Sequence, residues 1–201
     1  HTAVIEIRCN IAVDAESSAS NILTAAKAAF VDAGSKAVIL SINSGGGSPV
    51  QAGIINDELK RMRTHYNKPL YAVVGDTSAS GAYYVAVAAD EIFVDKASMV
   101  GSIGVLMDGF GFTGTMEKIG VERRLITAGE NKGFLDPYSP LKPEQRVHAQ
   151  NMINQINVQF ITVVRNFRGN KLKESPEMFS GLVWNGEQAI QLGLADKLGN
   201  V

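Results

Sequence analysis

Ser80 is a residue whose surroundings suggest catalysis. It stands between Ala79 and Gly81 in the stretch TSASGAYY, where an apolar run typical of a buried strand gives way to a helical pattern. A serine at a strand-to-helix turn can act as a nucleophile, because the turn raises its hydroxyl above the sheet and points the next backbone N–H at the same oxyanion. Serine is also a common N-cap residue, so the position alone leaves both roles open.

A nucleophilic serine needs a general base, and none of the three histidines fits that role. His1 is the terminal residue, while His65 and His148 fall within helical patterns that face solvent, so all three are expected at the surface. Lysine can replace histidine where burial strips water from its ammonium group and lowers its pKa toward neutrality. The candidate is Lys132 in the stretch AGENKG, although most loop lysines are simply solvated.

A second stretch, SINSGGGSPVQAG, contains three consecutive glycines between a predicted strand that ends at Asn43 and a predicted helix that begins near Pro49. Glycine lets backbone N–H groups approach a ligand closely, and the helix N-terminus adds the positive end of its dipole. A phosphate-binding P-loop is excluded because no lysine follows the glycines, and the dinucleotide pattern GxGxxG is absent here. An oxyanion-binding loop or a plain tight turn remains.

The composition limits the classes of function. The chain has 201 residues, of which 45% are hydrophobic and 19% charged, and its formal net charge is −1. This suits one globular domain and provides no field of one sign to attract nucleic acid or an anionic membrane surface. The single cysteine, Cys9, excludes an internal disulfide and a cysteine zinc site, and is expected in the core or at a sheet edge. No apolar stretch reaches the roughly 20 residues that span a bilayer.

Apolar runs typical of strands alternate with helical patterns along the chain. This alternation predicts an α/β fold of βαβ units with a largely parallel sheet. The longest helical pattern carries an apolar stripe that must pack against this core or against a neighbouring molecule. The expected strands cover residues 2–8, 36–43, 70–76, 91–95, 101–107 and 122–129, and the expected helices cover 20–32, 49–66, 80–89, 113–119, 143–167 and a short segment within 186–192.

Four stretches together resemble the signal peptide peptidase A family of membrane-associated serine peptidases: VILSINSGGGSPVQAG, TSASGAYYVAVAADEIFVDKASMVGSIGVLM, AGENKG and NGEQAIQLGLADKLG. They occur in the family's order and extend over nearly the whole chain. The resemblance implies a Clp protease/crotonase-like fold of stacked βαβ units, with a mostly parallel sheet and a long C-terminal helix. It also implies one peptidase domain over residues 1–201, with a catalytic core at about 3–140 and a helical extension at about 141–201.

The resemblance also implies the site residues. Members of the short form use a Ser/Lys dyad, and the 52 positions from Ser80 to Lys132 match their spacing, which makes Ser80 the nucleophile and Lys132 the general base. The N–H groups of Gly46 and Gly81 would form the oxyanion hole, because NSGGG aligns with the family's NSPGG. Gly45 stands here in place of that proline.

Further expectations follow from the same resemblance. Ser102, in VGSIGV, matches a serine that orients the lysine, and neither a metal nor a cofactor is implied. Relatives with two tandem copies place serine and lysine in different copies, so this chain is expected to form a ring-shaped homo-oligomer in which Lys132 completes the neighbouring subunit's site. The substrates would be hydrophobic peptides such as spent signal peptides. An N-terminal membrane anchor outside this chain would hold the catalytic domain on the extracytoplasmic side.

Two other functions fit the same sequence. A crotonase-type acyl-CoA enzyme would use the same oxyanion arrangement and place acidic residues near the site, for which Glu130 beside Lys132 is the one hint. A non-catalytic scaffold would keep the fold without turnover, and the presence of both Ser80 and Lys132 argues against it.

Overall fold

The structure is a computed structural model that describes residues 1–201, and the chain divides into two compact units. Unit 1 comprises His1–Gly104 and Val158–Val201, and unit 2 comprises Val105–Asn157. None of the helices combines the length and the apolar character needed to cross a membrane.

Most of the secondary structure belongs to unit 1. Helix α4 lies in unit 2, and α5 begins in unit 2 and ends in unit 1. The elements in chain order are β1 (Ala3–Ile11), α1 (Ala19–Val31), β2 (Val38–Gly47), α2 (Pro49–Tyr66), β3 (Leu70–Ala79), α3 (Gly81–Ala86), β4 (Glu91–Val94), β5 (Met99–Gly101), α4 (Thr113–Lys118), α5 (Pro143–Arg168), the 3₁₀ turn η1 (Gly169–Lys171), β6 (Val183–Trp184), α6 (Gly186–Gln191) and β7 (Lys197–Leu198).

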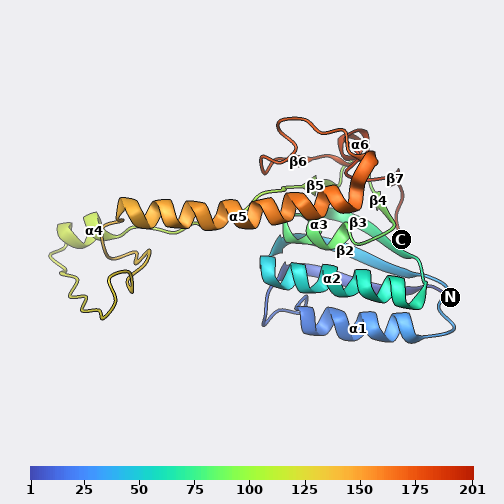
Figure 1. Ribbon diagram of the computed structural model, residues 1–201, viewed down its shortest axis with the longest axis horizontal. Helices are drawn as coiled ribbons and strands as arrows, with labels where there is room; N and C mark the ends of the chain where they lie inside the picture. The colour runs from blue at the N-terminus through green and yellow to red at the C-terminus, as the bar shows by residue number, and fades with distance from the viewer. The chain divides into compact units, whose positions relative to one another are not determined.

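Unit 1 is built on a seven-stranded sheet in which β1, β2, β3, β4 and β7 lie side by side in that order. These neighbours all pair in parallel, β5 pairs in parallel with β3, and β6 pairs antiparallel with β5. Because β1 to β4 follow one another in chain order and such crossovers are right-handed, α1, α2 and α3 all cover the same face of the sheet (Figure 1). The predicted α/β fold with a mostly parallel sheet and a long C-terminal helix is confirmed.

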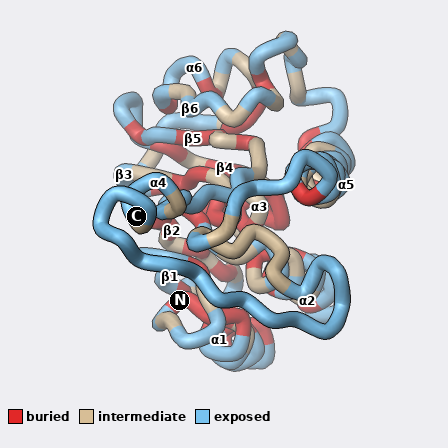
Figure 2. Tube along the Cα trace, turned by 90° about the vertical axis from the view of Figure 1, so that its left-hand side faces the viewer, coloured by how far each residue is buried: buried red, intermediate tan, exposed pale blue.

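The hydrophobic core lies between the sheet and these helices (Figure 2). In α1 the buried Ile22, Ala26 and Phe30 recur every four residues, which is the spacing of one helix face. The end of α5 covers α3, where the ring of Phe160 lies 5.0 Å from that of Tyr84. The apolar stripe of α5 therefore packs, over its last part, against this core.

Two predicted strands, at residues 101–107 and 122–129, are wrong. β5 ends at Gly101, and residues 102–112 and 121–127 have no regular secondary structure. A strand forms only where its backbone N–H and C=O groups find a neighbouring strand, and these two apolar runs have none in the chain. The left-handed φ of Gly101 (110°) and Ser102 (49°) also turns the backbone out of the extended conformation.

A buried ion pair fixes the end of α5 within unit 1. Arg168 is 3% exposed, and its guanidinium donates to both carboxylate oxygens of Asp196, at 2.8 and 3.1 Å, and to the Gly193 carbonyl at 2.8 Å. Burial alone would raise the pKa of Asp196, but hydrogen bonds from Arg168, Lys171 and the Ile92 N–H outweigh burial and lower this pKa to about 2. The Asp196 carboxylate therefore stays charged and paired at neutral pH.

Replacing Arg168 by methionine is expected to lower the free energy of unfolding by roughly 3 kcal/mol or more, because Asp196 would stay buried after losing its main partner. Arg165→Met, one turn earlier in α5, is the matched control. Arg165 pairs with Glu174 at 2.8 Å, but the two side chains are 52% and 42% exposed, and such pairs contribute at most about 1 kcal/mol. Urea denaturation measures both losses, and equal losses would contradict the role assigned to the buried pair.

Candidate active site

Ser80 lies at the turn between β3 and α3 in a strained backbone conformation. Its φ and ψ are 53° and −125°, a region that residues other than glycine rarely occupy. Its N–H donates to the Gly101 carbonyl at 2.8 Å, and its own carbonyl accepts the Tyr84 N–H at 3.0 Å. Although Ser80 occupies the N-cap position of α3, its hydroxyl makes no capping hydrogen bond. The hydroxyl is therefore held at the turn without serving the helix.

The glycines of β2 pack directly against this β3–α3 turn. β2 continues through Gly47, four residues beyond the predicted end of the strand. A Cβ added to Gly46 would lie 2.6 Å from Gly81 N and 2.9 Å from Ser80 Cβ, and a Cβ added to Gly81 would lie 3.2 Å from Gly47 N. Only glycine fits at position 46, because any side chain there would collide with the turn. The predicted site residues Gly46, Ser80 and Gly81 are thus brought together.

Two N–H groups of this glycine segment have hydrogen-bond partners on the side of β1 or within β2. The Gly46 N–H donates to the Ser44 hydroxyl at 3.1 Å, and the Ser48 N–H donates to the Ile11 carbonyl of β1 at 2.8 Å. The Gly47 nitrogen lies beside the β3–α3 turn, 3.2 Å from the position that a Cβ on Gly81 would take. Gly46 therefore lies beside Ser80 and Gly81, and its N–H donates to the Ser44 hydroxyl.

Ser102 leaves the sheet next to Ser80. β3 and β5 pair in parallel with Ala79 opposite Gly101, so Ser80 and Ser102 each follow one member of that pair. Ser102 has a left-handed φ of 49°, and its N–H donates to the Leu182 carbonyl at 2.8 Å. Its half-buried side chain has no hydrogen-bond partner in the chain, so the hydroxyl is available to another group.

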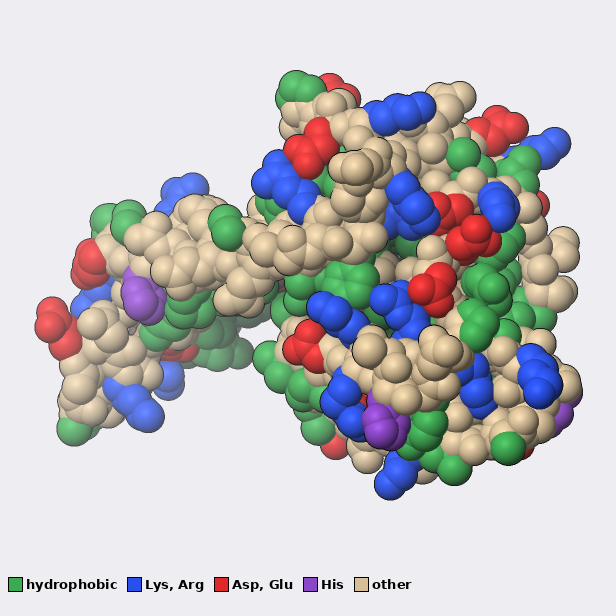
Figure 3. Space-filling model, turned by 45° about the vertical axis from the view of Figure 1, so that its right-hand side comes forward, with side chains coloured by type: hydrophobic (Ala, Val, Ile, Leu, Met, Phe, Trp, Pro, Cys, Tyr) green, Lys and Arg blue, Asp and Glu red, His purple; other side chains and the backbone are tan.

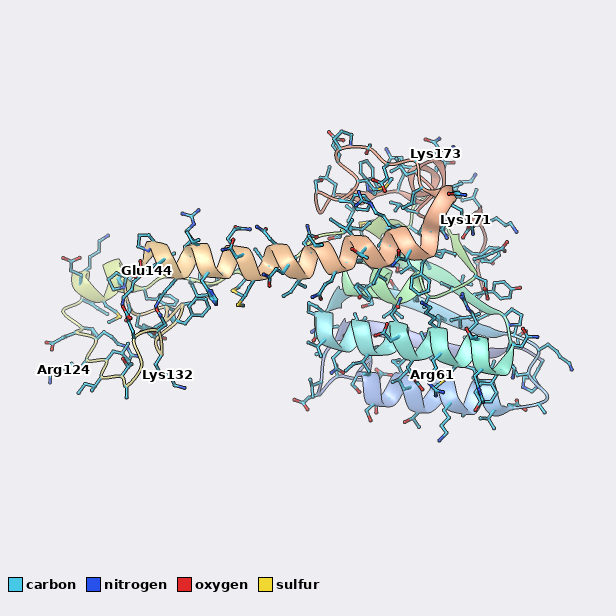
Figure 4. All side chains as sticks on the ribbon, viewed as in Figure 1. Arg61, Arg124, Lys132, Glu144, Lys171 and Lys173 are labelled. Atoms are coloured by element: carbon cyan, nitrogen blue, oxygen red, sulfur yellow. The ribbon has the colours of Figure 1, made fainter.

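Lys132 belongs to unit 2, in the loop that precedes α5 (Figure 4). Its side chain is exposed, and its ammonium group makes no hydrogen bond or ion pair within the chain. Gly46, Ser80, Gly81 and Ser102 all belong to unit 1. The two residues predicted for the dyad are therefore contributed by different units.

The remaining candidates lie where the sequence predicted them. His1, His65 and His148 are exposed, and Cys9 is a free, exposed cysteine on β1, an edge strand of the sheet. No three histidine, cysteine, aspartate or glutamate side chains are grouped so that they could hold a metal ion.

Comparison with known families adds to this geometry. The sequence profile named Peptidase family S49 matches residues 63–201. The chain belongs to peptidase family S49. The matched part contains Ser80, Gly81, Ser102 and Lys132. Membership in this family fits the Clp protease/crotonase-like arrangement expected for the sheet.

Two relatives named as peptidases and one named as an antiporter each match most of this chain. Protease 4 of Haemophilus influenzae is 32% identical over 204 residues, which cover 98% of this chain and 32% of that protein. A protein of Enterococcus faecium named putative signal peptide peptidase SppA is 30% identical over 179 residues, or 89% of this chain and 52% of that protein. The Na(+)/H(+) antiporter NhaA of Brucella abortus is 44% identical over 173 residues, or 86% of this chain and 24% of that protein.

The chain spans about half, or less, of the length of these relatives. The family profile and the relatives named SppA and protease 4 confirm the resemblance to the signal peptide peptidase A family.

Proposed function

We propose that this S49 chain is the peptidase domain of a serine endopeptidase, with Ser80 as nucleophile and Lys132 as general base. The observation that carries the proposal is the strained β3–α3 turn, which holds the Ser80 hydroxyl free beside a glycine segment. Such a turn presents a serine to a carbonyl carbon and places backbone N–H groups near the carbonyl oxygen. The substrates we propose are hydrophobic peptides such as spent signal peptides, in keeping with the name of the Enterococcus relative.

The reaction is an acyl transfer through an acyl-enzyme. Neutral Lys132 takes the proton of the Ser80 hydroxyl while Ser80 Oγ attacks the peptide carbonyl carbon, and the lysine then gives this proton to the leaving amine. The same lysine next activates a water molecule, which hydrolyses the ester and frees Ser80. The charge on the carbonyl oxygen is stabilised by the N–H groups of Gly81 and Gly47, and Ser102 orients the lysine.

Gly47 takes the place of Gly46 as the second oxyanion donor in this mechanism. The Gly46 N–H is bonded to Ser44, whereas the Gly47 nitrogen lies beside Gly81. These two positions support a donor one residue later than the resemblance implied.

Lys132 can act as a base only when its amine is uncharged, which requires that water be kept away from it. In the single chain Lys132 is exposed, so we propose that a second copy of the chain packs over it and excludes water from its amine. Unit 2 offers a surface for such a copy, because it contributes no residue to the buried hydrophobic core and exposes many large hydrophobic side chains (Figure 3). The six most exposed are Leu106, Phe110, Ile119, Ile126, Leu141 and Val147, at 57% to 97%.

A closed ring would both exclude water from Lys132 and bury the hydrophobic side chains of unit 2. In this ring each Lys132 acts as the base for the Ser80 of the neighbouring subunit. Homo-oligomers with closed symmetry repeat one contact around the ring, so every site is completed in the same way. A membrane anchor outside residues 1–201 would hold this ring at the extracytoplasmic face of the membrane.

Labelling with a fluorophosphonate, which reacts with activated serines, tests the assignment. Wild type should be labelled, Ser80→Ala should not, and Lys132→Ala should be labelled at least about 100-fold more slowly. Lys142→Ala, at another exposed lysine of unit 2, is the control and should react like wild type. Full-rate labelling of Lys132→Ala near neutral pH would remove the lysine from the dyad. A wild type that is not labelled would favour the crotonase-type enzyme or the scaffold.

A further inference from the structure

The buried hydroxyl of Ser44 connects two segments at the edge of the proposed oxyanion hole. Ser44 is 3% exposed, accepts the Gly46 N–H at 3.1 Å and donates to the Cys9 carbonyl. Cys9 has a left-handed φ of 58° and lies where β1 shifts register against β2, between Arg8 and Asn10. One side chain thus ties the irregular part of β1 to the glycine segment of β2.

The glycine segment depends on such ties because it has no side chains of its own to pack. Gly46 and Gly47 have φ values of 101° and 147°, and glycine loses more conformational freedom on folding than any other residue. The Gly47 N–H lies between two anchored neighbours: the Gly46 N–H is held by Ser44, and the Ser48 N–H is held by Ile11. Removing one of these anchors frees the peptide groups on that side to rotate.

We propose that Ser44 is a positioning residue for the oxyanion hole, an inference that rests on the proposed peptidase function. Ser44 does not touch the substrate. It holds the Gly46 N–H, and this bond helps to fix the next peptide group, whose Gly47 nitrogen lies beside Gly81. An oxyanion donor must be aimed before the charge develops, and a displacement of about 1 Å can cost as much as 100-fold in rate.

Ser44→Ala tests this role, with Ser41→Ala as the matched control. Ser41 is in the same strand but on its other face, and its side chain makes no hydrogen bond. Steady-state hydrolysis of a chromogenic hydrophobic peptide gives kcat and KM. A peptide aldehyde adds a second readout, because its adduct with Ser80 places an oxyanion in the hole.

For Ser44→Ala we expect kcat to fall about 10- to 100-fold, KM to stay within about twofold, and aldehyde affinity to fall in parallel with kcat. The control should match wild type in all three values. Ser44→Cys keeps the volume of the side chain but is only a weak hydrogen-bonding group, so it should show the same pattern if Ser44→Ala is too unstable to assay.

The outcomes separate this inference from the proposed function. An active wild type with Ser44→Ala within about twofold of its kcat would overturn the role of Ser44 and leave the peptidase intact. A rise in KM without a loss of kcat would overturn the role of Ser44 in the same way. A wild type that neither hydrolyses the peptide nor binds the aldehyde would overturn the proposed function, and the role of Ser44 with it.

Discussion

Peptidase activity is expected to return when two inactive variants, Ser80→Ala and Lys132→Ala, are assembled into the same oligomer. Each variant alone should lose roughly 10⁴-fold or more in kcat, because the dyad acts as a unit. In a ring where Lys132 completes the neighbouring site, an intact Ser80 from one subunit can meet an intact Lys132 from the other. Random assembly of equal amounts restores about a quarter of the sites.

Co-expression with two different affinity tags, followed by purification on both, isolates the mixed oligomers for a peptidase assay. The control replaces the Ser80→Ala partner by the double variant Ser80→Ala/Lys132→Ala, which carries no intact lysine and should restore nothing. No recovery in the first mixture would mean that each lysine serves the serine of its own subunit. Full activity in a preparation that light scattering shows to be monomeric would contradict the ring in a second way.

Gly46→Ala is expected to abolish activity and to destabilise the protein. The new Cβ would lie 2.6 Å from Gly81 N, 2.7 Å from the Ala79 carbonyl oxygen and 2.9 Å from Ser80 Cβ, so it collides with the turn that holds Ser80. The φ of 101° is also one that alanine rarely adopts. We expect kcat to fall by at least about 100-fold and the free energy of unfolding to fall by about 2 kcal/mol or more.

Gly45→Ala, one residue earlier, is the matched control. Nothing lies within 4 Å of a Cβ at this position, and Gly45 is not among the glycines with a left-handed φ. Alanine there reduces the freedom of the unfolded chain, so stability should be unchanged or higher by roughly 0.5 kcal/mol, with activity retained. Peptide hydrolysis and urea denaturation of both variants measure these effects. Similar losses in the two variants would show that the close packing at Gly46 is not the cause.

Local signals in the sequence were sufficient to predict elements whose first residues include a capping residue or a proline. α2 was predicted at residues 49–66 and is Pro49–Tyr66, because Ser48 caps it and Pro49 suits a first helical turn. The apolar runs at 101–107 and 122–129 were misread as strands. Apolar character indicates that a residue is expected to be buried. It does not indicate whether the residue belongs to a strand or a helix, or is buried against another molecule.

The glycine segment shows a second limit of prediction from local sequence signals. The predicted strand ends at Asn43, and the three glycines are expected in a loop or turn. In the structure β2 continues through Gly47, and the Gly46 N–H donates to the Ser44 hydroxyl. Neither Ser44 nor Gly47 was singled out from the sequence.

By itself the sequence determined the α/β class, the small residues that surround Ser80, and a lysine at the spacing of a Ser/Lys dyad. Only the tertiary structure decided that the Ser80 hydroxyl caps no helix, that the Gly46 N–H donates to Ser44, and that Ser80 and Lys132 belong to different units. The reason is physical. Composition and spacing are local properties, whereas the direction of an N–H group depends on the register between strands that are far apart in the chain.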